Sequence, residues 1–149
     1  MSFFDKSEIW REFSANPPAH LQAIEKFEAE SRIQLPQDYV CFLQKMNGGE
    51  GEFGESYLAL WSIDDIVERN RGYMVAEATP GLLVFGSDGG NEAFGFDLRS
   101  NAKEIVAVPF IVLDWKDSIR VAPTFTAFLE AMYEFGPDAL FKSSTKEEG

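Results

Sequence analysis

The sequence predicts a single-domain α+β fold, and three observations support this. The chain has 149 residues, which is the size of one domain. Its apolar residues recur at helical spacing in the first third, form short strand-like runs after residue 80, and return to helical spacing near the end. With 45% hydrophobic and 14% aromatic residues, the chain can bury a large core without disulfides. A disordered or fibrous protein is therefore excluded.

Three helices are predicted before residue 70. The first, over 17–32, begins with Asn16 as a cap and two prolines in its first turn. The second, over 36–46, has apolar residues at i, i+3, i+4 and i+7 and ends at Asn47-Gly48-Gly49. The third, over 62–69, begins with a capping-box spacing.

Short strands dominate after residue 80. The expected strands are 82–85, 93–98, 105–108, 111–113 and 119–122. Each is an apolar or alternating run bounded by Gly, Asn, Ser or Pro. Because no long helices separate them, we expect mainly antiparallel pairing. Thr124 then caps a last helix over 125–135, which ends at Gly136.

The charge balance limits the kinds of partner. Thirteen Lys and Arg stand against 25 Asp and Glu, so the formal net charge is −12 at pH 7. A field of this sign repels nucleic-acid phosphates and anionic lipid headgroups. We therefore expect neither direct nucleic-acid binding nor membrane association.

Several features favour a reducing, cytoplasmic location. Cys41 is the single cysteine, so the chain has no internal disulfide. It lies in the apolar stripe of the second predicted helix, and we expect its thiol to be buried. The first residues lack the basic start and apolar run of a signal peptide, and the longest apolar stretch, 105–113, is too short to span a membrane.

Two motif-like segments are weak indicators of chemistry. The run 49–54 fits G-x-G-x-x-G, but it follows a predicted helix and carries two carboxylates where a pyrophosphate would lie. We expect a flexible acidic loop there. The acids around Asp88 offer oxygen ligands, but their spacing departs from a calcium loop. We predict no cofactor and no dedicated metal site; adventitious metal binding near Asp88 stays open.

The sequence shows no nucleophile paired with a general base, as hydrolysis would require. His20, the single imidazole, lies in the first turn of a predicted helix, and Cys41 has no visible partner. A pair of carboxylates acting as general acid and base remains open, because the chain has 25 acids.

The most informative charge pattern lies between residues 46 and 98. Ten acids in this stretch face only two arginines. The excess is typical either of a solvated face that keeps the chain soluble or of a surface that steers a basic partner. The tryptophans Trp61 and Trp115 and the tyrosines Tyr57 and Tyr73 are interpreted as half-buried packing residues or as interface anchors.

Six short motifs follow one another in order along the chain. They are Leu35-Pro36-x-x-Tyr39, Asn47-Gly48-Gly49, Leu60-Trp61-Ser62, Phe85-Gly86-Ser87-Asp88-Gly89-Gly90, Phe96-Asp97-Leu98 and Phe125-x-x-Phe128-Leu129. Together they resemble the SUKH superfamily, which joins a fungal regulator of cell-wall synthesis to bacterial immunity proteins. The resemblance covers about residues 20–135.

The resemblance implies an α+β fold in which helices pack against a curved, mostly antiparallel (mixed) β-sheet. It divides the chain into an N-terminal helical extension (1–19), a SUKH-like domain (20–136) and a partly disordered C-terminal tail (137–149). The motif residues have structural roles in helix starts and turns. The insertion 50–55 lies where members of the superfamily vary, so contact residues cannot be transferred to it.

The resemblance also implies a non-enzymatic role. Bacterial members bind and block toxins, often nucleases or nucleobase deaminases, and the compactness of this chain favours that type. We predict an immunity protein that neutralises a basic toxin domain through an acidic surface. One alternative is a regulatory or scaffold module that binds a cellular protein or peptide, and another is a carboxylate-pair hydrolase. An exposed strand edge would also allow a homodimer.

The predicted partner-binding surface combines acids of the central stretch with two aromatic anchors. These residues are Glu50, Glu52, Glu55, Tyr57, Trp61, Asp64, Asp65, Glu68 and Asp88.

Overall fold

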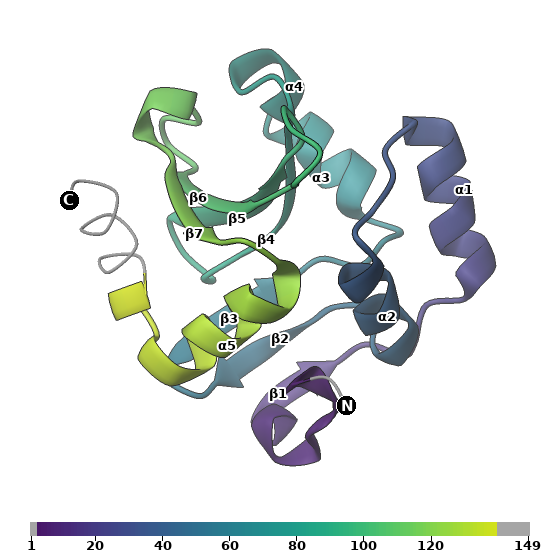
Figure 1. Ribbon diagram of the computed structural model, residues 1–149, viewed down its shortest axis with the longest axis vertical. Coiled ribbons are helices and arrows are strands. Elements are labelled where there is room, and N and C mark those ends of the chain that lie inside the picture. Colours follow the sequence, from purple (N-terminus) through teal and green to yellow (C-terminus); the bar gives the residue numbers. More distant parts are fainter. Residues whose placement is uncertain (1–2, 140–149) are drawn as a thin grey trace.

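The computed structural model describes residues 3–139, which form a seven-stranded sheet surrounded by helices (Figure 1). The strands are β1 (Phe13–Ala15), β2 (Gly49–Phe53), β3 (Ser56–Leu60), β4 (Leu82–Ser87), β5 (Glu92–Asp97), β6 (Ile105–Pro109) and β7 (Ile119–Ala122). The α-helices are α1 (Leu21–Ser31), α2 (Gln37–Lys45), α3 (Ile66–Gly72), α4 (Val75–Ala78) and α5 (Phe125–Phe135). Short 3-10 helices are η1 (Phe3–Asp5), η2 (Ser7–Trp10) and η3 (Trp115–Asp117).

The strands lie in the sheet in the order of the sequence, and all six pairings are antiparallel. Short turns join β2 to β3 and β4 to β5, as antiparallel pairing allows, whereas α1 and α2 lie between β1 and β2 and α3 and α4 lie between β3 and β4. The predicted α+β class with an antiparallel sheet is therefore confirmed.

Aromatic rings fill the core between the sheet and helices α2 and α5. Tyr39 of α2 and Phe125 of α5 have ring centroids 4.9 Å apart. Both rings contact Phe85 of β4, and Phe128 lies 4.9 Å from Phe94 of β5. All five side chains are 2% exposed or less, so this cluster removes a large apolar area from water. In Figure 1 the sheet curves around α5, which carries one side of the cluster.

The central strands are also buried on their other face. Side chains alternate along a strand, so Ala93 lies opposite to Phe94, and Val108, its partner on β6, shares its face. Ala93 and Val108 are fully buried. Helices α3 and α4 contact β4 and η3 contacts β6, so these helices cover the face turned away from α5.

Strand β3 leaves β4 early, and Asn70 of α3 takes its place. The two strands pair only through residues 59–60 and 86–87. Beyond that point Asn70 Nδ2 donates to the Val84 carbonyl (2.8 Å), and Val84 N–H donates to Asn70 Oδ1 (2.9 Å). One side-chain amide thus satisfies a strand edge that would otherwise be unpaired, beside a bulge between Val84 and Gly86.

The helices that the sequence predicts are present, with two shifted starts. The helix predicted over 62–69 is α3, which runs from Ile66 to Gly72 because residues 63–65 form a turn before it. The first helix begins at Leu21 because Asn16 and Pro17 are used elsewhere: Asn16 Nδ2 donates to the Asn47 carbonyl (2.9 Å), and the Pro17 carbonyl accepts from Asn47 N–H (3.2 Å). The predicted cap at Thr124 is confirmed, since its hydroxyl accepts from Ala127 N–H at 3.1 Å.

The strand predicted over 111–113 is wrong. After β6, the Val112 and Leu113 N–H groups both donate to the Pro109 carbonyl, at 3.2 and 2.9 Å, which makes a turn. The side chain of Ile111 is 90% exposed, so an apolar run here does not mark a buried strand.

The sequence interpretation also missed the first half of the sheet. The run 49–53, expected as a flexible loop, is strand β2, which pairs with β1 and β3. Cys41 is exposed rather than buried, because the apolar stripe of α2 faces the core through Tyr39, Phe42 and Leu43, which lie on the other side of the helix.

The segment before residue 20 contains η1, η2 and β1, and β1 forms the first edge of the sheet. The tail expected over 137–149 lies outside the described residues from 140 onward. Among residues 3–139, no helix combines the length and the hydropathy that a membrane span requires.

Asn70→Ala is expected to lower the free energy of unfolding by about 2–4 kcal/mol, because it leaves the N–H and C=O of Val84 without their partners. Urea denaturation measures the change. Asn101→Ala is the matched control, since Asn101 is exposed in a turn, and it is expected to change stability by less than about 0.5 kcal/mol. Equal effects of the two variants would show that Asn70 does not hold the edge of β4.

Candidate functional site

A groove opens on the face of β2 and β3 that is turned away from α5. Its volume is about 360 Å³. Residues that line it include Ser14, Glu50, Ala59, Trp61, Asp65 and Arg69. We call this hollow the outer groove. Its two walls come from the sheet and from the start of α3, which carry carboxylates at Glu50 and Asp65.

The register of β2 and β3 gathers acidic and aromatic side chains beside the outer groove. Glu50 pairs with Ala59 and Glu52 pairs with Tyr57, so these four side chains share one face. The Tyr57 hydroxyl donates to Glu50 Oε2 at 2.7 Å. This bond holds the Glu50 carboxylate at the edge of the groove, although both side chains are exposed.

The two glutamates raise the pKa of Tyr57. The largest cause is the hydrogen bond to Glu50, which the neutral phenol makes and the phenolate loses. Partial burial and then the charges of Glu50 and Glu52 act in the same direction. The raised pKa of Tyr57 therefore reflects the bond to Glu50 first and the negative charge of this face last.

Asn47 joins the two walls of the outer groove. Its Oδ1 accepts from Ile63 N–H at 2.8 Å, and its Nδ2 donates to Asp64 Oδ2 at 2.9 Å. Gly48 follows with φ +78°, and a Cβ there would lie 2.3 Å from the Leu60 carbonyl oxygen. A side chain at position 48 would push β3 away, so glycine is required for this close approach.

A row of stacked aromatic rings extends from Trp61, in the outer groove, through Tyr73 to Phe110. Arg69 lies over the Trp61 ring at 5.3 Å, and Tyr73 stacks on Trp61 with ring centroids 6.1 Å apart and planes 3° apart. Tyr73 also stacks on Phe110, at 4.4 Å. Such stacking fixes the orientation of the rings and of the guanidinium.

The turn between β4 and β5 brings further carboxylates next to Tyr57. A Cβ at Gly89, which has φ +82°, would lie 2.7 Å from the Tyr57 ring, so the turn packs closely against it. Asp88 Oδ1 accepts from the N–H groups of Gly90 (2.8 Å) and Glu92 (3.2 Å). Burial, and then the charge of Asp88, raise the pKa of Glu92.

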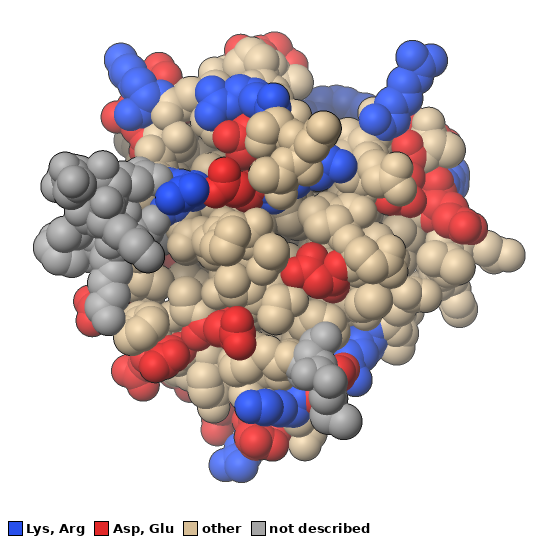
Figure 2. All heavy atoms as spheres, in the orientation of Figure 1, with Lys and Arg blue, Asp and Glu red and all other residues tan. Residues whose placement is uncertain are grey.

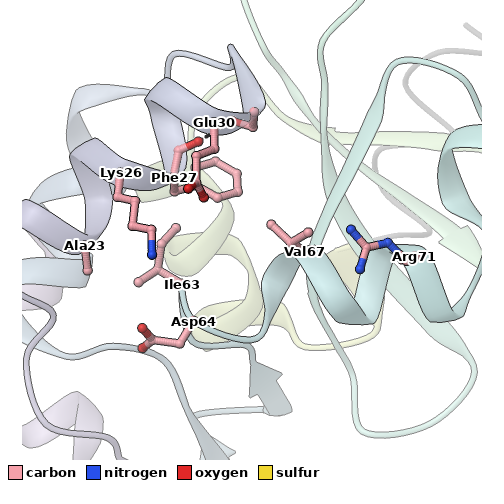
Figure 3. A pocket seen from close by; sticks show the side chains of 9 residues that line it. Ala23, Lys26, Phe27, Glu30, Ile63, Asp64, Val67 and Arg71 are labelled. Carbon is pink, nitrogen blue, oxygen red and sulfur yellow. Dashed lines mark hydrogen bonds between the residues drawn. The ribbon is translucent and has the colours of Figure 1, made fainter.

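A second hollow, of about 450 Å³, lies between α1 and α3 (Figure 3). Phe27 and Ile63 contribute apolar surface, and Val67 points into the hollow. Its rim carries both signs of charge, with Lys26 on α1 and Asp64 before α3 among them. The lining of the outer groove also carries both signs of charge, with Glu50, Asp65 and Arg69, and Glu52 adds a carboxylate on the same face as Glu50.

The structure brings together some of the nine predicted partner-binding residues and separates the others. Glu50, Glu52, Tyr57, Trp61 and Asp65 lie on or beside the outer groove. Trp61 is only 8% exposed, so its ring supports neighbouring side chains more than it offers contact area.

The other four predicted residues lie at different places. Asp88 is in the turn that packs on Tyr57, and Glu68 is exposed on α3. Asp64 faces the second hollow. Glu55 lies near the end of α5, where its N–H donates to the Tyr133 carbonyl at 3.0 Å.

The sequence interpretation did not include three residues that shape this region. Arg69 lines the outer groove, and Phe110 and Ile111 lie beyond Tyr73. The apolar run after Pro109 carries the signal for the last two, but the sequence predicts a strand over 111–113. Only the ring contact with Tyr73 places it here.

Acidic residues on the face seen in Figure 2 form separate groups with uncharged surface between them, and basic residues lie mostly near its upper and lower ends. The negative charge of the chain is therefore not gathered into one patch on this face. Within residues 3–139, no group of three or more His, Cys, Asp or Glu side chains is placed to hold a metal ion.

Comparison with known proteins identifies the family to which the chain is similar. The sequence profile of the SMI1 / KNR4 family (SUKH-1) matches residues 18–131. No curated protein sequence matches the chain significantly. The matched region contains β2 to β7 and most of α5, and so includes the outer groove except for Ser14 and Asn16.

Glu50→Gln is expected to move the pKa of Tyr57 down toward the ordinary tyrosine value, because the variant removes a charged acceptor. Carbon NMR of ring-labelled tyrosine across a pH titration measures this, and Tyr57→Phe identifies the resonance. Glu30→Gln, on α1, serves as the control and is expected to leave the titration unchanged. A Tyr57 titration that is the same in Glu50→Gln and in the wild type would contradict the hydrogen bond.

Proposed function

The chain belongs to the SMI1 / KNR4 family (SUKH-1), and on this premise we propose that it is an immunity protein that binds and neutralises a cognate toxin. The family consists of immunity and regulatory domains that generally act through protein–protein contacts rather than catalysis. The proposed mode of action is therefore occlusion of a toxin's active site, without a chemical step on the immunity protein.

The observation that carries this proposal is the acidic face beside the outer groove. Glu50 and Glu52 project from β2, and Asp65 lies on the opposite wall. Nucleases, and deaminases that act on nucleic acids, bind phosphates with Lys and Arg side chains. Carboxylates on a rigid scaffold can pair with those side chains and block them. A toxin of the nuclease or deaminase type fits this surface.

The net charge of −12 acts at longer range than these contacts. Opposite charges on two proteins raise the rate of encounter by about 10- to 1,000-fold, and the gain falls steeply with ionic strength. Rapid capture suits a protein that must act before a toxin reaches its target. We place this encounter in the cytoplasm, where the exposed thiol of Cys41 stays reduced.

A regulatory or scaffold module is the second candidate, because the family includes regulators as well as immunity proteins. The neighbouring gene distinguishes the two. A polymorphic-toxin gene directly upstream supports neutralisation, and the absence of such a gene favours a regulatory partner. A carboxylate-pair hydrolase is the third candidate; turnover in a substrate panel that one Asp or Glu substitution abolishes would support it.

Co-expression with the toxin domain encoded by the neighbouring gene tests the proposal. We expect growth to be restored and a complex to be isolated. The combined variant Glu50→Gln, Glu52→Gln and Asp65→Asn is expected to lower the association rate constant about 10-fold or more at low ionic strength, with a smaller difference at high salt, because it removes three steering charges. Stopped-flow fluorescence measures the rate.

The matched control neutralises three other exposed acids, Glu8, Glu25 and Glu134, which gives the same change of net charge at other places. It is expected to lower the rate much less. If the two triple variants behave alike, only the overall charge matters and the acidic face is not the contact surface. A homodimer through an exposed outer edge of the sheet, at β1 or β7, stays a prediction.

A further inference from the structure

Exposed apolar side chains are concentrated beyond the outer groove. Eight large apolar side chains are exposed among residues 3–139, and four of them are Tyr73 (44%), Met74 (58%), Ile111 (90%) and Val112 (48%). They belong to two segments that the contact between the Tyr73 and Phe110 rings joins. We call Tyr73, Met74, Phe110, Ile111 and Val112 the apolar platform. Single exposed apolar residues are ordinary on a protein surface, whereas such a group marks an interaction site.

Backbone and side-chain hydrogen bonds fix both segments of the platform. In the first, Tyr73 N–H donates to the Arg69 carbonyl (3.1 Å) and Met74 N–H to the Arg71 carbonyl (3.0 Å). Phe110 N–H donates to the Asn91 carbonyl at 2.8 Å. The buried Thr79 hydroxyl donates to the Leu113 carbonyl at 2.7 Å, and Trp115 Nε1 donates to the Pro80 carbonyl at 2.7 Å. The platform is therefore preorganised, so a partner that binds it loses little entropy in ordering it.

Backbone geometry gives a second, independent observation. Met74 has φ +58° and Leu113 has φ +39°, and these two residues lie at the ends of the segments that form the platform. This region of φ is unfavourable for both residue types, and glycine or asparagine is usual there. Met74 exposes its side chain in this strained conformation (58%), whereas the side chain of Leu113 is buried (6%) directly after the platform. Strained residues cluster at binding sites, and Met74 is such a residue within the platform.

The apolar platform is continuous with the acidic face. Trp61 lines the outer groove, and its ring stacks on Tyr73 of the platform. Protein interfaces commonly have an apolar centre of a few strongly bound residues and a charged rim. The platform and the acids of the outer groove have this arrangement side by side.

We infer that the apolar platform, with Ile111 at its tip, is the anchor that inserts into an apolar pocket of a basic partner protein, while the acids beside the outer groove form the steering rim. The inference rests on the proposed function. A second copy of this chain fits less well, because each copy carries a charge of −12 and their acidic faces would be brought together. A basic partner removes that repulsion.

The two parts of the surface make different contributions to binding. Rim charges act mainly on association and depend on salt, whereas desolvated apolar anchors act mainly on dissociation and depend little on salt. Substitutions on the platform are therefore expected to shorten the lifetime of a complex at any ionic strength.

Selection from a phage-displayed library of random dodecapeptides tests the inference without a known partner. The full-length wild type is the bait, and Ile111→Asp is used for counter-selection. We expect recovered peptides to combine bulky apolar residues with Lys or Arg. The synthetic peptide recovered most often is expected to bind Ile111→Asp and Tyr73→Ala at least 10-fold more weakly than wild type, at both low and high salt.

Leu21→Asp, on α1, is the matched control, because Leu21 is also an exposed apolar residue (48%). It is expected to change peptide affinity less than 2-fold. Ile111→Asp is expected to keep the unfolding midpoint of the wild type, since the side chain is 90% exposed. Urea denaturation of each variant therefore separates lost binding from lost folding.

Three results would overturn the inference, and they are distinguishable. Basic peptides that respond to Glu50→Gln, Glu52→Gln and Asp65→Asn but not to Ile111→Asp would leave the proposed function intact and remove the platform from it. Apolar peptides without Lys or Arg would contradict both the basic partner and the proposed function. A dimer in sedimentation velocity that Ile111→Asp dissociates would assign the platform to a second copy.

Discussion

The hydrogen bonds of Asn47 hold together the segments from which the candidate site is built. Its backbone N–H and C=O bind Pro17 and Asn16, and its side chain binds Ile63 and Asp64. The residue is 8% exposed, so each unpaired group would carry a desolvation cost. Because this one residue after α2 binds both the segment before α1 and the segment before α3, the walls of the outer groove keep a fixed separation.

Asn70, within α3, has a related role. It binds the backbone of Val84 where β3 has left the sheet, so α3 is attached to β4 by hydrogen bonds as well as by packing. Trp61 directly follows β3, and Tyr73 stacks on its ring while Arg69 lies over it. The sheet, α3 and the turn after β6 meet there, since Tyr73 also stacks on Phe110. A surface assembled from three elements in this way can be rigid without a cofactor, metal or disulfide at its centre.

An acidic rim beside an apolar platform also suits a protein whose function is to bind. Charged side chains remain solvated while the partner is absent, which keeps the chain soluble despite exposed residues such as Ile111. Apolar side chains provide contact area once the partner has arrived. The two kinds of residue therefore serve different stages of one event, and the division follows from the range of each force: electrostatic attraction extends over several ångströms of water, and apolar burial requires contact.

The sequence by itself determined the α+β class, the helices α2 and α5 and the strands β4 to β7, because their periodicity and their caps are local properties. It also placed the excess of acids in the central stretch and indicated the family. Only the tertiary structure decided that Gly49–Phe53 is a strand, because glycine and glutamate have little strand preference and the pairing with β1 and β3 overrides it. The tertiary structure alone also decided that the run after Pro109 is a turn and that Phe110 stacks on Tyr73. Contacts between residues far apart in the chain leave no periodic signal in the sequence.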